Sequence, residues 1–276
     1  MILDLFKLDH KVALVTGAGR GLGQAMAIAL AEAGADVAGL DVLPLDETAA
    51  RVQALGRRFL PLSANLLEAH TADMDAVVAQ VVAGLGNLDI LINNAGISLT
   101  PKFFDDISEE QFERVININL WGVYHGTRAF LPHLRTRPEA GIVNMSSLAG
   151  LVGLPTYSAY AMSKFAVRAL SESLQSELSK TNISVLVVFP GGVKTNIIKN
   201  APDLKEDERE SAHNAFTKMA LLTAGDTADR ILRALQKRKK RLVLGPDAKI
   251  FLTLRNLFPN RFPAIFYNIF GKAMFK

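Results

Sequence analysis

Short runs of apolar and β-branched residues recur along the chain, and longer stretches with apolar residues at helical spacing separate them. A run such as SerValLeuValValPhe at 184–189 is almost continuously apolar, which is typical of parallel strands that helices cover on both faces. Seven segments are therefore predicted to be strands: 12–16, 36–40, 59–62, 88–92, 141–145, 183–189 and 241–244.

The segments between these runs have the periodicity of amphipathic helices. In one of them Ala228, Ile231, Leu232 and Leu235 lie on a single helical face. Helices are predicted over 21–33, 68–83, 108–134, 158–180 and 227–239. Because strands and helices alternate over most of the chain, we expect an α/β fold with a doubly wound, Rossmann-type, seven-stranded parallel sheet. We expect a single domain that spans residues 1–276.

Two segments interrupt the alternation. The polar stretch 196–223 is predicted to be an irregular loop that acts as a substrate lid. The tail 247–276 has no Asp or Glu from Ala248 onward, and Pro259 and Pro263 predict two short helices rather than one. Its composition fits an anionic bilayer surface and fits equally well packing over the substrate pocket or against a second subunit. The basic and aromatic residues are Lys249, Phe251, Arg255, Phe258, Arg261, Phe262, Phe266, Tyr267, Phe270, Lys272, Phe275 and Lys276.

Composition excludes several classes of protein. The 276 residues carry 31 Lys and Arg against 27 Asp and Glu, a net charge of +4, and no basic run is interleaved with aromatics as a nucleic-acid groove requires. The absence of cysteine excludes disulfides, a thiol nucleophile and a thiolate metal site, and the five histidines lack ligand spacing, so no metal is expected. Without a signal-peptide core or an apolar stretch of about 18 residues, we expect a cytoplasmic protein, with peripheral membrane contact through the tail as an addition.

A glycine-rich turn follows the first predicted strand. Residues 16–23 read ThrGlyAlaGlyArgGlyLeuGly, with glycine at Gly17, Gly19, Gly21 and Gly23, and a helix begins at once. Glycines let the backbone approach a pyrophosphate closely, while the free N–H groups at the helix start favour its negative charge. This context predicts a dinucleotide site.

The choice between NAD and NADP depends on two residues. Asp41 ends the second strand, near the point about 20 residues past the first glycine where this fold places an acid to bind the ribose hydroxyls. A carboxylate there repels the 2′-phosphate of NADP and favours NAD. Arg20, within the glycine loop, offers a partner for that phosphate, so NADP remains the less favoured alternative.

The glycine loop, AsnAsnAlaGly at 93–96 and TyrAlaMetSerLys at 160–164 occur together in this order. In these motifs the sequence resembles the short-chain dehydrogenase/reductase family over about residues 10–195. The resemblance implies a single-domain oxidoreductase that transfers a hydride between NAD(H) and a secondary alcohol or ketone. It also implies a catalytic set of Asn119, Ser147, Tyr160 and Lys164, in which Ser147 orients the substrate oxygen and Asn119 holds a water that connects Lys164 to solvent.

The chemistry of this set can be argued from the residues. A phenol with a pKa near 10 is a poor base at neutral pH, so Tyr160 requires help. Lys164 lies one helical turn later on the same face, where its ammonium favours the phenolate. A lone Tyr-x-x-x-Lys pair is often only a pair on the surface of a helix. Here the glycine loop and Ser147 favour a catalytic role for it.

The family's cofactor contacts carry over residue by residue. Asn65 stands where the family has an aspartate that contacts adenine, and its amide oxygen can still accept a hydrogen bond from the adenine amine. The contacts implied by the resemblance are Gly17, Gly19, Arg20, Gly21, Leu22, Gly23, Asp41, Asn65, Leu66, Asn93, Ala95, Gly96, Tyr160, Lys164, Pro190, Gly191, Val193 and Thr195.

The substrate and the partners are predicted more coarsely. The segment 148–157 is almost wholly apolar, which favours a lipid-, steroid- or aromatic-like alcohol or ketone. The resemblance implies a homodimer paired through the helices at 108–134 and 158–180, and Trp121 is expected in the core. The alternatives are a sensor that binds the dinucleotide without turnover and a protein that acts at a membrane surface.

Overall fold

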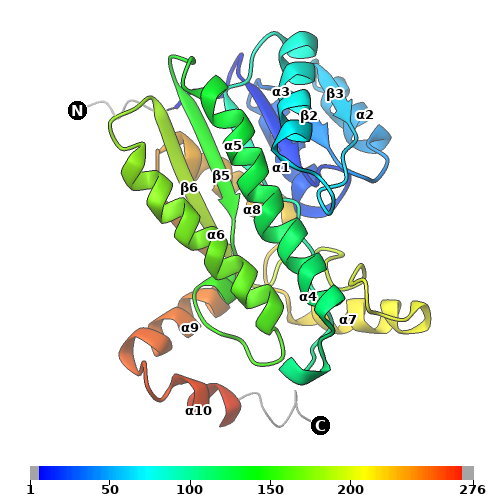
Figure 1. Ribbon diagram of the computed structural model, residues 1–276. Helices are drawn as coiled ribbons and strands as arrows, with labels where there is room; N and C mark the ends of the chain where they lie inside the picture. The colour runs from blue at the N-terminus through cyan, green and yellow to red at the C-terminus, as the bar shows by residue number, and fades with distance from the viewer. Residues whose placement is uncertain (1–5, 269–276) are drawn as a thin grey trace.

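Seven parallel strands form the central sheet of the computed structural model, which describes residues 6–268 (Figure 1). The strand order is β3-β2-β1-β4-β5-β6-β7, so the direction of winding reverses between β1 and β4. The predicted doubly wound sheet is confirmed, and ligands of such folds bind where the order reverses, beyond the carboxyl ends of the strands. The strands are β1 (Val12–Thr16), β2 (Asp36–Leu40), β3 (Phe59–Leu62), β4 (Ile90–Asn93), β5 (Ala140–Met145), β6 (Ile183–Pro190) and β7 (Arg241–Leu244).

Helices connect the strands and cover both faces of the sheet. The predicted helix 108–134 is helical throughout but contains a π turn, η2, in its middle. The predicted irregular segment 196–223 contains a helix, α7, which periodicity did not reveal. The α-helices are α1 (Gly21–Glu32), α2 (Asp46–Ala54), α3 (Thr71–Leu85), α4 (Glu109–Ile116), α5 (Gly122–Leu134), α6 (Ser158–Glu177), α7 (Arg209–Met219), α8 (Ala224–Gln236), α9 (Pro246–Leu257) and α10 (Phe262–Phe266). The short turns are η1 (Phe104–Asp106), η2 (Asn117–Trp121), η3 (Leu148–Gly150) and η4 (Glu206–Glu208).

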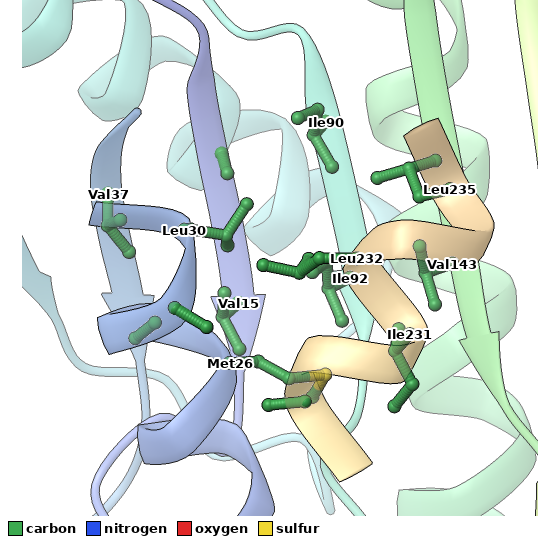
Figure 2. Packing of buried hydrophobic residues seen from close by; sticks show 14 of the residues in the cluster. Val15, Met26, Leu30, Val37, Ile90, Ile92, Val143, Ile231, Leu232 and Leu235 are labelled. Atoms are coloured by element: carbon green, nitrogen blue, oxygen red, sulfur yellow. The ribbon is translucent and has the colours of Figure 1, made fainter. Parts of the chain in front are cut away.

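The strands β1, β2, β4 and β5 are buried at every residue, as their continuous apolar character requires, whereas the edge strands β3 and β7 are partly exposed. In β1, Val15 points into the core formed with α1 and α8, whereas Leu14 points into the core formed with α3, α5 and α6. Figure 2 shows Leu30 of α1 and Leu232 of α8 meeting over the central strands. Phe130 of α5 is fully buried on the opposite face. The two hydrophobic layers hold the carboxyl ends of β1, β4 and β5 in a fixed arrangement.

The tail packs onto the body of the protein as α9 and α10, so the prediction of two short helices is confirmed. Phe262 and Phe266 are each only 5% exposed and join Leu151 and Phe189 in a separate hydrophobic cluster. The tail residues Phe270, Lys272, Phe275 and Lys276 lie outside the described residues. Within 6–268, no helix combines the length and apolarity that crossing a bilayer demands.

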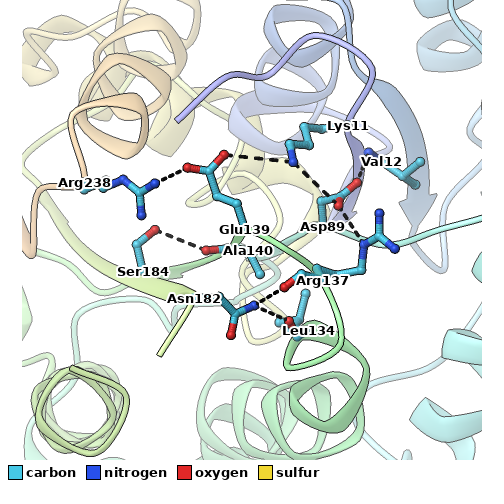
Figure 3. A network of polar contacts seen from close by, with 10 residues as sticks. All are labelled: Lys11, Val12, Asp89, Leu134, Arg137, Glu139, Ala140, Asn182, Ser184 and Arg238. Atoms are coloured by element: carbon cyan, nitrogen blue, oxygen red, sulfur yellow. Dashed lines mark hydrogen bonds and ion pairs between the residues drawn. The ribbon is translucent and has the colours of Figure 1, made fainter. Parts of the chain in front are cut away.

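A network of charged groups joins the amino ends of the strands (Figure 3). Asp89, only 2% exposed, accepts a hydrogen bond from the amide of Val12 at 3.0 Å and one from Nε of Arg137 at 2.9 Å. Glu139, which directly precedes β5, pairs with Arg238, which follows α8. The network lies at the end of the sheet opposite the carboxyl ends of the strands.

Candidate active site

The glycine loop between β1 and α1 has the geometry of a close-approach site. Gly17 and Gly21 have φ of 71° and 58°, values that favour glycine. A Cβ on Gly23 would lie 1.9 Å from the carbonyl oxygen of Gly17, so no side chain fits there. The loop therefore presents bare backbone at the start of α1, which is what a pyrophosphate requires.

Two residues that sequence reasoning did not single out hold this loop against β4. The Nδ2 of Asn94 donates to the carbonyl of Thr16 at 2.9 Å. The Thr16 hydroxyl accepts from the amides of Asn94 and Ala95 at 2.9 and 3.0 Å. By contrast, Asn93 turns its side chain to the other face of the sheet, where it donates to Asn144 at 2.8 Å. Successive residues of a strand point to opposite faces, so one asparagine borders the loop and the other ties β4 to β5.

Asp41 has a structural task besides its predicted one. Its Oδ2 accepts from the amide of Gly19 at 2.8 Å, and its Oδ1 accepts from the amide of Leu43 at 3.1 Å. Arg20 interacts electrostatically with the carboxylate of Asp41. Burial lowers the pKa of Arg20, and the charge of Asp41 opposes that shift. The acid at the end of β2 is therefore part of the glycine loop's own support.

Asn65 and Leu66, the predicted adenine contacts, follow β3. The Oδ1 of Asn65 accepts from the amide of Leu67 at 3.1 Å in a local turn. Leu66 lines a surface hollow of about 490 Å³ together with Trp121 and His125. Trp121 is 45% exposed and stacks on His125, so the expectation of a core tryptophan is wrong. An aromatic residue on a helix can satisfy helical periodicity and still face solvent.

The catalytic candidates meet at the carboxyl ends of β4 and β5. The Nζ of Lys164 lies 5.6 Å from the centre of the Tyr160 ring and donates to the carbonyl of Met145 at 3.0 Å. Burial lowers the pKa of Lys164 to about 8. Burial also raises the pKa of Tyr160, and a hydrogen bond with the side chain of Ser147 partly offsets the rise. Tyr160 thus lies near both Ser147 and Lys164.

Asn119, the fourth catalytic candidate, is connected to the other three through the segment that follows β4. It lies within η2 and is fully buried, and its Oδ1 accepts from the amide of Ile97 at 2.8 Å while its Nδ2 donates to Ser163 at 3.1 Å. A Cβ on Gly96 would lie 3.1 Å from the Oδ1 of Asn119 and 3.3 Å from the Nζ of Lys164, so glycine permits this approach. Asn119 therefore anchors the segment that follows β4 beside Lys164.

The loop after β6 presents two backbone groups in one direction. The carbonyl of Gly192 accepts from the amide of Leu222 at 3.1 Å, and the amide of Lys194 donates to the carbonyl of Leu222 at 2.8 Å. Because N–H and C=O of one planar peptide unit point in opposite directions, the N–H and the C=O of Val193 both face away from Leu222. Thr195, whose hydroxyl donates to the carbonyl of Val193 at 3.4 Å, lies on that side.

Thr195 also connects this loop to the glycine loop. A Cβ on Gly21 would lie 3.6 Å from the Cβ of Thr195. The predicted residues Pro190, Gly191, Val193 and Thr195 and the glycine loop are therefore brought to one place. A donor and an acceptor side by side are the complement of a primary carboxamide.

The walls of the site come from loops. In the apolar segment 148–157, Leu151 and Val152 are buried against the tail, so packing accounts for part of its apolar composition. On the other side Asp203 fastens the segment 196–205: it accepts from the hydroxyl of Thr100 at 2.6 Å and lies 3.0 Å from the Nζ of Lys102. Burial alone would raise the pKa of Asp203, but these bonds and the charge of Lys102 lower it below its ordinary value.

These features are those of a doubly wound α/β fold with a candidate dinucleotide site at the point where the strand order reverses. Comparison with known proteins names the family. Residues 11–206 match the family model of the short chain dehydrogenases, and the chain belongs to this family of oxidoreductases.

Individual relatives agree with this assignment. The chain is 37% identical over 235 residues to (-)-trans-carveol dehydrogenase of Rhodococcus erythropolis, which covers 76% of this chain and 83% of the relative. It is also 37% identical over 213 residues to 2-dehydro-3-deoxy-D-gluconate 5-dehydrogenase of Escherichia coli, covering 77% of this chain and 82% of the relative. A Burkholderia phymatum short chain dehydrogenase/reductase, solved in complex with NAD, superimposes with a TM-score of 0.83 at 27% identity and covers 92% of this chain and 95% of that one.

Proposed function

We propose that the protein oxidises a secondary alcohol, or reduces the corresponding ketone, with NAD(H). The observation that carries this proposal is the cluster of Tyr160, Ser147 and Lys164 at the carboxyl ends of the strands, beside a glycine loop that no side chain fills. The family relationship supports it. A sensor that binds the dinucleotide without turnover would have no use for this proton-transfer group.

In this mechanism the bound dinucleotide supplies the hydride acceptor or donor. Tyr160 holds the proton that moves between its phenolic oxygen and the substrate oxygen, and Ser147 orients that oxygen by a hydrogen bond. A phenol is protonated at neutral pH, which is the form that donates a proton during ketone reduction, and burial raises the pKa of Tyr160 further. For alcohol oxidation the ammonium of Lys164 must favour the phenolate. Asn119 holds the segment that follows β4 beside Lys164, and the family relationship supports its role in the proposed water path to solvent.

We propose NAD as the preferred cofactor, with its ribose hydroxyls at Asp41. The carboxylate of Asp41 is held in place by the amides of Gly19 and Leu43, so it is a fixed negative charge at the expected 2′ position. Placing a phosphate beside it would cost repulsion in addition to desolvation. Arg20 carries the opposing charge that would favour NADP.

We propose a hydrophobic substrate. Of the charges in the loop walls, Lys102 and Asp203 pair with each other, which leaves neither to bind a charged substrate. The similarity to a carveol dehydrogenase supports an apolar alcohol. The equal identity to a sugar-acid dehydrogenase makes polar sugar acids the contrasting arm of the test.

The test is a panel of alcohols and ketones, from cyclic terpenes to sugar acids, assayed by NADH absorbance with wild type and Tyr160→Phe. We expect turnover of hydrophobic members and a loss of at least about 100-fold in kcat for Tyr160→Phe with NAD binding retained. Tyr124→Phe, which alters a tyrosine outside the site, should leave kcat unchanged. Wild type that binds NADH but turns over no member would favour the sensor.

We propose a homodimer in which the helical segments 108–134 and 158–180 meet their copies. Each of the two helical segments carries a large exposed apolar side chain, Trp121 at the end of η2 and Met162 in α6, with exposed fractions of 45% and 53%. Sedimentation should give a dimer for wild type and a monomer for Trp121→Glu with Met162→Glu. A wild-type monomer would contradict the pairing.

We also propose that the outward face of the tail touches anionic membranes. Ile250 and Leu257 recur two helical turns apart and are 57% and 66% exposed, and Phe258 is 44% exposed. The exposed bases beside them are Lys249, Arg255 and Arg261. Co-sedimentation with vesicles that contain phosphatidylserine, but not with phosphatidylcholine vesicles, is expected for wild type and not for Leu257→Asp with Phe258→Asp. Equal sedimentation of both proteins would refute this contact.

A further inference from the structure

Asp247, in the first turn of α9, reaches across to the loop that follows β6. Its Oδ2 accepts a hydrogen bond from the amide of Gly192 at 2.8 Å, although the two residues are 55 positions apart. The amide of Gly191 donates to the carbonyl of Leu244 at 2.8 Å, so successive amides of the loop are fixed by β7 and by Asp247. Asp247 is the side chain that supplies an acceptor at this point.

The glycines around Asp247 are fitted to its carboxylate. A Cβ on Gly191 would lie 2.1 Å from Oδ1 of Asp247, and a Cβ on Gly245 would lie 2.3 Å from the same atom. Gly245 also has a φ of 96°. Oδ1 itself is buried without a hydrogen-bond partner among the described residues. A buried carboxylate oxygen in this state is costly, which is unexpected for a residue whose only task is to begin a helix.

The contact fixes the peptide unit that immediately precedes the one carrying the N–H of Val193. Gly192 is held at its amide by Asp247 and at its carbonyl by Leu222, so rotation about its φ and ψ is restricted at a residue that would otherwise be the most permissive in the loop. The orientation of the N–H of Val193 follows, because that N–H shares a rigid plane with the carbonyl of Gly192. Leu222 alone would hold only the carbonyl side of Gly192, whereas Asp247 also holds its amide, so both peptide units that flank Gly192 are fixed.

We propose that Asp247 is a positioning residue for the nicotinamide end of the cofactor. By holding the amide of Gly192 it supports the loop conformation in which Leu222 orients the N–H and C=O of Val193 toward the carboxamide, so it acts through the loop and does not touch the reacting atoms. This inference rests on the proposed function. The proposal also makes the tail part of the cofactor site. The helix α9 carries Asp247 at its start and packs against the apolar segment 148–157 through Phe251 and Leu252.

The test compares two ligands that differ by the nicotinamide group. Binding of NADH and of ADP-ribose is measured by calorimetry for wild type, Asp247→Ala, Asp247→Asn and the control Asp226→Ala, which removes an acid from the first turn of α8 without touching the loop. We expect Asp247→Ala to weaken NADH binding about tenfold and to leave ADP-ribose within about twofold, the scale of one charge-assisted hydrogen bond. Asp247→Asn keeps an acceptor and should recover most of the loss, and Asp226→Ala should change neither ligand.

Each outcome has a separate meaning. A wild type that binds NADH no better than ADP-ribose contradicts the proposed nicotinamide site itself. If the wild-type protein binds NADH more tightly than ADP-ribose and the Asp247→Ala variant does so by the same factor, the positioning role is overturned. Equal weakening of both ligands also overturns it, since that is the signature of general destabilisation. If Asp247→Ala does not fold, Asp247→Ser provides the same comparison, because its hydroxyl is too short to make the 2.8 Å contact.

Discussion

Replacing Lys164 by methionine should abolish turnover and yet stabilise the protein without its cofactor. Lys164 is 4% exposed, and burial lowers its pKa from 10.5 to about 8. At about 1.4 kcal/mol per pKa unit, holding the charged form in the folded protein at pH 7 costs about 3 kcal/mol. Methionine has a similar length and no charge, but it loses the hydrogen bond to the carbonyl of Met145, worth about 1 kcal/mol. The net gain is about 2 kcal/mol.

The sign of the pH dependence follows from the same shift. Between pH 8 and 10.5 the unfolded chain keeps the proton on Lys164 while the folded protein has released it. The unfolded state then binds more protons, so this residue makes the free energy of unfolding of wild type rise with pH through that window. The penalty is complete below pH 8 and is relieved above it, so the advantage of Lys164→Met should shrink as the pH rises.

The assay is urea unfolding of the apo protein at pH 7 and pH 9.5, with Lys180→Met as the matched control for an exposed lysine. Lys164→Met should be more stable at pH 7 by about 2 kcal/mol and by clearly less at pH 9.5, while Lys180→Met stays near wild type. A variant that is less stable at pH 7, or whose difference from wild type does not depend on pH, would refute the reasoning that burial of the charge is costly.

Three other changes test separate parts of the site. Asp203→Asn should release the segment 196–205 from Lys102, so limited proteolysis of this segment should become fast at neutral pH. The wild-type protein should become sensitive only as the pH falls below 3.8. Equal resistance of both proteins at neutral pH would show that Asp203 does not hold the segment. Asp41→Ala should narrow or reverse the preference for NAD in kcat/KM, and a wild type that uses NADP equally well would contradict the assignment. Truncation after Asp247 removes Phe262 from its cluster and the helix that carries Asp247. We therefore expect a fall in Tm and in activity on hydrophobic substrates, with NAD binding weakened but not abolished; unchanged values would show that the tail is dispensable.

Sequence patterns predicted the features that depend on residues close together in the chain, namely the strands and the spacing within a helix. Continuous apolar runs located the strands, and the one-turn spacing of Tyr160 and Lys164 placed both on one face of α6. The patterns did not reveal Asp247 at Gly192 or Asp203 at Thr100, because each pair joins segments whose closeness depends on the whole fold. For Asn94, the alternation of side chains along β4 was an available signal: the first asparagine of the pair faces one side, so the second faces the glycine loop.

The charge network around Asp89 bears on how this protein can change. It joins the amino ends of strands of four to six residues, so about 13–20 Å of sheet separates it from the loops that line the site. At such separations the energetic effects of substitutions add independently. A replacement in the walls that destabilises the fold can therefore be offset by a stabilising one near Asp89 without altering the chemistry. The molecule thus has one end on which substrate preference can be varied and another on which the resulting loss of stability can be compensated.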